Sequence, residues 1–175
     1  DKIVLHDLLI GEVWFGSGQS NMELPVSRVT DMFRDEIAAY ENTNIRQLKV
    51  PNIFNFHAPQ ADLPDYVAWK PLTQENVMNF SALAYFFAKA MYEKNSIPIG
   101  LINSSWGGTP VEAWISEEGL KEFPKYINEK RQYEDDAYLK SIKQTEGLSF
   151  YRWNTSLYQG DAGLHEACLL YTSPS

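Results

Sequence analysis

Apolar and polar positions along this chain alternate between the period of a strand and that of a helix. Residues 13–17 form a short apolar run that predicts a buried strand, and residues 45–50 alternate like a second strand. Residues 97–102 are apolar on both faces, as in a central parallel strand covered by helices. Residues 31–41 and 81–94 show helical spacing. Strands that alternate with helices predict an α/β fold built on a parallel sheet.

The clearest apolar face belongs to the helix predicted at residues 81–94. We expect it to pack against the core through Leu83, Phe86, Phe87, Ala90 and Met91. Residues 52–72 are rich in proline, asparagine and aromatic residues, which predicts an irregular connection or a small hairpin. Further on the chain becomes charged, and we expect Ser116 to cap one helix and Pro124 to begin another.

Composition narrows the class of protein. The chain has 175 residues, 44% of them hydrophobic, which is enough for a globular core. Its net charge of −8 argues against a nucleic-acid partner, because phosphate binding needs a basic surface. No apolar run is long enough to span a bilayer. A single cysteine, Cys168, excludes both an internal disulfide and a multi-cysteine metal site.

Candidate chemistry lies in two loops that each follow a predicted strand. Residues 16–22, Gly-Ser-Gly-Gln-Ser-Asn-Met, can lift Ser20 onto the rim of the sheet as a nucleophile, although Ser20 could equally cap the next helix. Residues 99–114 repeat this plan, with Gly107 and Gly108 after the strand. Because loops at the carboxyl ends of parallel strands share one crevice, the two loops are expected to face each other.

These blocks resemble the sialate O-acetylesterase family, a carbohydrate-esterase branch of the SGNH hydrolases. The resemblance covers about residues 3–116 and includes 11–14, 18–22, 79–87, 106–110 and 112–114, in the family's order. It implies a three-layer, flavodoxin-like α/β fold, present here in part. It also implies a serine esterase that removes acetyl groups from sugars such as sialic acid or plant and bacterial glycans, in a periplasmic, secreted or lysosomal location.

The same resemblance assigns roles to individual residues. Ser20 matches the family's nucleophile, and its own N–H would be one oxyanion donor. A second donor would come from the Gly107-Gly108 pair, and we favour Gly108. Gln19, Asn21 and Trp106 are candidate substrate contacts. This mechanism requires no metal and no cofactor, and its partner is an acetylated carbohydrate.

The base that would activate Ser20 is missing from the matching blocks. The family supplies it from an Asp-x-x-His pair, whereas Asp161 and His165 are four positions apart in a stretch that no longer resembles the family. A third family block carries an asparagine, but Gly163 stands at the nearest corresponding position here. His6 and His57, the other two of three histidines, are interpreted as structural or exposed.

We therefore expect residues 1–160 to be an amino-terminal part of an SGNH-type esterase domain. Residues 1–10 are interpreted as the end of a preceding β domain, and residues 161–175 as a tail that departs from the family, such as an out-of-frame terminus. A chain without the catalytic His and Asp should be nearly inactive, since a serine hydroxyl is a weak nucleophile without a base.

Two other functions fit parts of the sequence. A non-catalytic carbohydrate-binding module would account for the aromatic residues and the missing base. Dinucleotide binding is suggested by Gly16-Ser17-Gly18 after a strand, but Asn21 replaces the third glycine and no acidic residue ends the second strand at Val50. The esterase therefore remains the favoured interpretation.

Overall fold

The computed structural model describes residues 4–53, 57 and 61–142. These residues fall into two compact units. The first unit is made of residues 4–53 and 61–107, and the second of His57 and residues 108–142.

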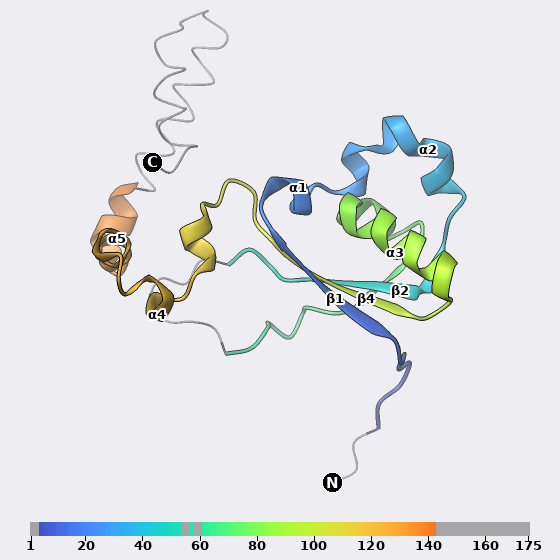
Figure 1. Ribbon diagram of the computed structural model, residues 1–175, viewed down its shortest axis with the longest axis horizontal. Coiled ribbons are helices and arrows are strands. Elements are labelled where there is room, and N and C mark those ends of the chain that lie inside the picture. The colour runs from blue at the N-terminus through green and yellow to red at the C-terminus, as the bar shows by residue number, and fades with distance from the viewer. Residues whose placement is uncertain (1–3, 54–56, 58–60, 143–175) are drawn as a thin grey trace, which may run out of the picture. The chain divides into compact units, whose positions relative to one another are not determined.

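A sheet forms the centre of the first unit. Its strands are β1 (Glu12–Gly18), β2 (Asn42–Lys49), β3 (Lys70–Leu72) and β4 (Ile99–Ser105), in the order β1-β4-β2-β3. Both β1 and β2 pair with β4 in parallel, and β3 pairs with β2 antiparallel. The helices of this unit are α1 (Ser20–Glu23), α2 (Thr30–Ala38) and α3 (Ala82–Asn95), with 3-10 turns η1 (Val26–Arg28) and η2 (Val77–Asn79). This arrangement, visible in Figure 1, confirms the α/β fold with a mainly parallel sheet.

The register of β1 with β4 decides where the two glycine-containing loops emerge. Glu12 pairs with Ile99 at one end and Gly18 with Ser105 at the other, without a shift between them. The strands therefore end together, so the loops that follow leave from the same edge of the sheet. This confirms the expected placement of both loops at one edge.

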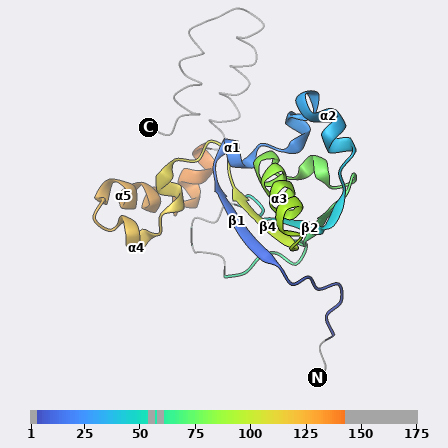
Figure 2. The same cartoon turned by 45° about the vertical axis from the view of Figure 1, so that its right-hand side comes forward.

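The core lies between the sheet and α3, which runs along one face of the strands in Figures 1 and 2. Alternate residues of β4 are buried, as a strand with one covered face requires. The buried hydrophobic cluster comprises Val26, Val29, Ile37, Ile45, Leu72, Val77, Phe80, Ala82, Ala84, Tyr85, Ala88, Ile99 and Leu101.

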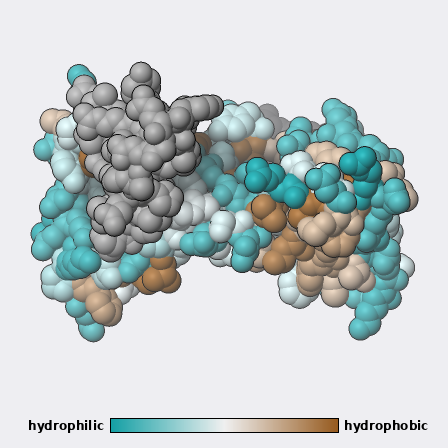
Figure 3. All heavy atoms as spheres, turned by 90° about the horizontal axis from the view of Figure 1, so that it is seen from above, coloured by the Kyte–Doolittle hydropathy of each residue, from teal (hydrophilic) through white to brown (hydrophobic). Residues whose placement is uncertain are grey.

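The expected core face of the helix is wrong in detail. Leu83 is 52% exposed, whereas Ala84, Tyr85 and Ala88 are buried. Ala90 is also exposed, whereas Phe86, Phe87 and Met91 are partly buried against the core as expected. The buried positions 81, 84, 85 and 88 keep the i, i+3, i+4, i+7 spacing of one helix face, which is turned relative to the expected face. The space-filling view shows hydrophobic residues gathered over the helices of the first unit (Figure 3).

Three strands also differ from the sequence expectation. The apolar run at residues 13–17 predicts a buried strand, but β1 is an outer strand of the described sheet, and its Val13, Trp14 and Phe15 are 63%, 43% and 66% exposed. β4 extends to Ser105, three residues beyond the apolar run that ends at Ile102. These residues pair with Gly16, Ser17 and Gly18 of β1, and the buried Ser105 hydroxyl donates to the buried Asn103 Oδ1. β3 departs from the irregular connection expected over residues 52–72, and its Pro71 is tolerated on an edge strand because no donor is needed there. Residues 54–56 of the expected hairpin lie outside the described residues.

The described part of the second unit contains η3 (Val111–Trp114), α4 (Glu117–Leu120) and α5 (Pro124–Tyr133), and residues 136–142 are helical as well. The Ser116 hydroxyl accepts a hydrogen bond from Gly119 N at 3.2 Å, and Pro124 begins α5, so both expectations are confirmed. A hydrogen bond from the Tyr126 hydroxyl lowers the pKa of Glu112 below its usual value of 4.5.

Gly11, the residue before β1, should tolerate an added side chain less well than Gly100 of β4. A Cβ there would lie 2.0 Å from the backbone oxygen of Pro98, which itself accepts from Glu12 N. A Cβ on Gly100 would instead meet Cη2 of Trp69 at 3.1 Å, and that ring can shift. In urea titrations we expect Gly11→Ala to lower the free energy of unfolding by about 2 kcal/mol or more, and Gly100→Ala by less than about 1 kcal/mol. The reverse order would contradict the packing described for β1.

The bond between Tyr126 and Glu112 predicts a pH dependence for the second unit. Since the pKa of Glu112 is lowered in the folded state, its contribution to stability is present above pH 4.5 and is lost as the pH falls through the lowered value. We expect Tyr126→Phe to raise the pKa of Glu112 toward 4.5, as followed by side-chain carboxyl NMR shifts. Equal titration midpoints in both proteins would show that the bond is not formed.

Candidate functional site

Ser20 stands where β1 turns into α1. β1 ends at Gly18, whose φ of 139° is a conformation that favours glycine, and Gln19 is the N-cap residue of α1. Ser20 is therefore the first residue of the helix, and its exposed hydroxyl donates to Gln19 Oε1 at 3.1 Å. No side-chain cap is formed at this helix start. The alternative in which Ser20 merely caps α1 is thus excluded.

The glycine loop lies directly beside Ser20. Trp106 N donates to Gly18 O at 3.0 Å, which continues the pairing of the two chains beyond their strands. A Cβ built on Gly107 would lie 3.5 Å from Cα and 3.6 Å from Cβ of Ser20. The structure therefore brings Ser20 and Gly107, 87 positions apart in sequence, into contact distance at one edge of the sheet.

Gly108 follows Gly107, and the reason for a glycine differs between the two positions. Its φ is 80°, in the left-handed region, and nothing lies within 4 Å of a Cβ built there. Glycine is therefore favoured at position 108 by backbone conformation and at position 107 by close approach of neighbouring atoms.

The site also contains a carboxylate that was not predicted from the sequence. Glu23, the last residue of α1, accepts a hydrogen bond from Gly107 N through Oε2 at 2.5 Å, and from Asn52 Nδ2 through Oε1 at 3.0 Å. The Ser-x-x-Glu spacing of residues 20–23 is typical of a capping box, in which the glutamate would bond back to its own helix start. The local pattern thus gives a signal for Glu23, but it points to a different partner.

The three residues expected to contact substrate lie around the same turn. Gln19 and Asn21 are exposed on either side of Ser20, and Trp106 is half-buried at the end of β4. Their contact with a substrate remains a prediction.

No histidine base is found next to Ser20 in the described part of the first unit. His6 precedes β1 whereas Ser20 follows it, so the seven residues of the strand separate them by about 20 Å. His57 belongs to the second unit, where its Nε2 lies 3.2 Å from Asp136 Oδ1. The pair Asp161 and His165, and Gly163, lie outside the described residues.

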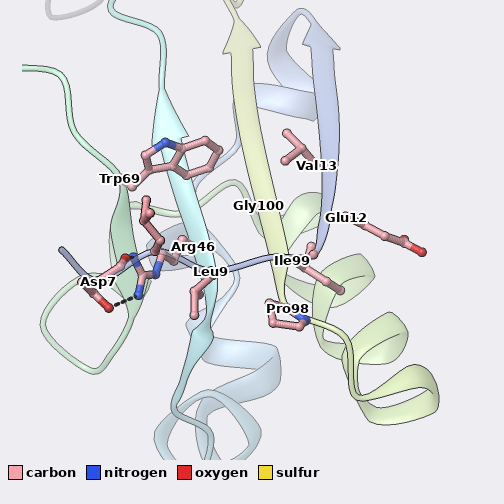
Figure 4. Close-up of a pocket in the computed structure, with 11 residues that line it drawn as sticks. Asp7, Leu9, Glu12, Val13, Arg46, Trp69, Pro98, Ile99 and Gly100 are labelled. Carbon is pink, nitrogen blue, oxygen red and sulfur yellow. Dashed lines mark hydrogen bonds and ion pairs between the residues drawn. The ribbon is translucent and has the colours of Figure 1, made fainter. Parts of the chain in front are cut away.

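A cavity of about 300 Å³ opens at the amino-terminal ends of β1 and β4, opposite the ends from which the two glycine loops leave. Figure 4 shows Trp69 and Val13 on its two sides, with Gly100 between them. Arg46 closes one end, because its Nη2 pairs with Asp7 Oδ1 at 2.7 Å and its Nη1 donates to Asp7 O. The polar groups of this cavity are thus used to hold the segment before β1, and the cavity is separate from Ser20.

No group of three or more His, Cys, Asp or Glu side chains gathers as a metal site within residues 4–53, 57 and 61–142. In the same ranges no helix is both long and apolar enough to cross a membrane.

Several known proteins are similar to this chain in sequence or in structure. The human sialate O-acetylesterase is 40% identical over 128 residues, which is 67% of this chain and 23% of that protein. The rat sialate O-acetylesterase is 36% identical over 125 residues. A solved structure of a carbohydrate acetylesterase from Xanthomonas citri is similar with a TM-score of 0.61 at 39% identity, covering 67% of this chain and 26% of that one.

The chain thus spans less than a quarter of the length of the curated relatives described. The family model for sialic acid-specific acetylesterases matches residues 11–153, which contain both loops of the candidate site. This chain belongs to the sialic acid-specific acetylesterase family of carbohydrate esterases.

Proposed function

We propose that this chain carries the nucleophile and part of the oxyanion site of a serine esterase that removes O-acetyl groups from sugars. The observation that supports it most is the closeness of Gly107 to Ser20: a Cβ built on Gly107 would lie within 3.6 Å of both Cα and Cβ of Ser20. An exposed hydroxyl beside backbone amides at the carboxyl edge of a parallel sheet suits attack on an ester. The family of the chain supports an acetylated carbohydrate as substrate.

The reaction would proceed in two displacement steps. Ser20 Oγ attacks the carbonyl carbon of the acetyl group while a base takes its proton, and the carbonyl oxygen becomes an oxyanion. The intermediate collapses, the sugar oxygen leaves with a proton from the base, and Ser20 remains acetylated. Water then attacks the acetyl-serine in the same way and releases acetate.

Two backbone amides would hold the oxyanion. Ser20 is the first residue of α1, where an amide has no acceptor within the helix. Of the two glycines, Gly107 already donates its N–H to Glu23, so the second donor is assigned to Gly108. Loss of one such donor typically lowers turnover by roughly a hundredfold to a thousandfold.

A histidine outside the described residues would serve as the base. In the described first unit, the one histidine, His6, is separated from Ser20 by the length of β1. Without such a histidine beside it, Ser20 would lack the group that activates it.

Substitution of Ser20 tests the function in a protein extended to the length of its relatives. We expect Ser20→Ala to lower acetate release from O-acetylated sialic acid or acetylated xylan by at least about a thousandfold, since no acyl-serine can form. Ser17→Ala is the matched control, because Ser17 is an exposed serine on β1 that the mechanism does not use. Unchanged acetate release with Ser20→Ala would refute the esterase mechanism. Sugar binding without turnover in the unsubstituted protein would favour the carbohydrate-binding module instead.

The 175-residue chain by itself tests the assignment of the base. We expect it to hydrolyse p-nitrophenyl acetate little faster than its Ser20→Ala variant, because the hydroxyl has no base to take its proton. Steady-state absorbance of released nitrophenolate is the measurement. Robust turnover that depends on Ser20 would show that a base lies within the chain.

A further inference from the structure

Glu23 connects three segments that emerge from three neighbouring parallel strands. It lies at the end of α1, which follows β1. Its Oε2 accepts from Gly107 N, just after β4, and its Oε1 accepts from Asn52 Nδ2, just after β2. All three residues belong to the first unit. One side chain therefore fixes the relative position of every loop that the parallel strands send to this edge.

The hydrogen bonds of Glu23 indicate a specific structural role for its carboxylate and not merely a charge on the surface. Glu23 is half-buried and forms no ion pair with another described residue. Both of its partners are neutral N–H donors, and hydrogen bonds to a carboxylate are shorter and about twice as strong as those between neutral groups. Such a bond to a backbone amide fixes the plane of the peptide that carries it.

The space around Gly107 is shaped by this carboxylate. A Cβ at position 107 would lie 2.8 Å from Glu23 Oε2, closer than it comes to any atom of Ser20. Glycine at this position therefore lets the carboxylate reach the amide. The sequence analysis explained a glycine here by the access that it gives an oxyanion to the backbone amide. That reason does not hold for Gly107, because its N–H already donates to Glu23.

We propose that Glu23 is a positioning residue of the esterase site: its carboxylate binds the Gly107 amide and holds the glycine loop against Ser20. In this arrangement Glu23 touches neither substrate nor reacting atoms. It acts by orienting the loop that carries Gly107. The role in turnover rests on the proposed esterase function, whereas the bond to the Gly107 amide does not.

The bond is tested by NMR on the isotopically labelled chain. We expect the Gly107 amide proton to move upfield in Glu23→Gln and its hydrogen exchange to become at least about tenfold faster in Glu23→Ala, because a charge-assisted bond is weakened and then lost. Glu41→Gln is the matched control, since the Glu41 carboxylate also accepts from a backbone amide, that of Gln74, at 2.6 Å. It should leave the Gly107 amide unchanged. A Gly107 amide that responds equally to both substitutions, or to neither, would overturn the proposal.

The role in turnover is tested in the protein extended to the length of its relatives. We expect Glu23→Ala to lower kcat by roughly a hundredfold with KM changed less than about twofold, because a misplaced loop weakens transition-state contacts more than substrate binding. Glu23→Gln should recover part of kcat, since its amide oxygen can still accept from Gly107. A kcat unchanged by Glu23→Ala, in a protein that Ser20→Ala inactivates, would overturn the positioning role alone. Activity that survives Ser20→Ala would instead overturn the esterase mechanism and leave the NMR result standing.

Discussion

The in-register parallel pairing of β1 with β4 is the constraint on which the candidate site depends. Because Glu12 pairs with Ile99 and Gly18 with Ser105, both strands end together and the chain leaves them at one edge. The bond from Trp106 N to Gly18 O extends the pairing into the loops themselves. A shift of one residue would turn every side chain of β1 to the opposite face and move Ser20 away from the glycine loop.

Two glycines and one carboxylate set the local geometry of the loops that the paired strands bring together. Gly18 turns the chain out of β1 with a positive φ, and Gly107 allows backbone and carboxylate to meet beside Ser20. Glu23 then joins the loops after β1, β2 and β4 through two hydrogen bonds. The site is thus built mainly from backbone groups at the ends of strands, which suits the binding of charge that develops during reaction.

Sequence periodicity predicted β1, β2, β4, α2 and α3, because each has a continuous pattern of its own. It misplaced the core face of α3. Ala84 and Ala88 are buried, but they are no more apolar than the exposed Leu83, so apolarity alone did not identify them as core residues. The nucleophile turn could be recognised because Gly18 and Ser20 directly follow an apolar run that does form a strand, although that strand is exposed rather than buried. The partnership of Glu23 with Gly107 could not, because it joins residues 84 positions apart and depends on the register of the sheet.

The contact between Ser20 and Gly107 is the central claim, and a nuclear Overhauser experiment on the 175-residue chain tests it most directly. A Cβ at position 107 would lie 3.5 Å from Cα of Ser20, so a Gly107 Hα that points along that direction is close to the Ser20 protons. We predict a strong cross-peak between Gly107 Hα and the Ser20 Hα or Hβ protons. Its absence, in a folded chain that shows the cross-strand peaks of β1 and β4, would contradict the account.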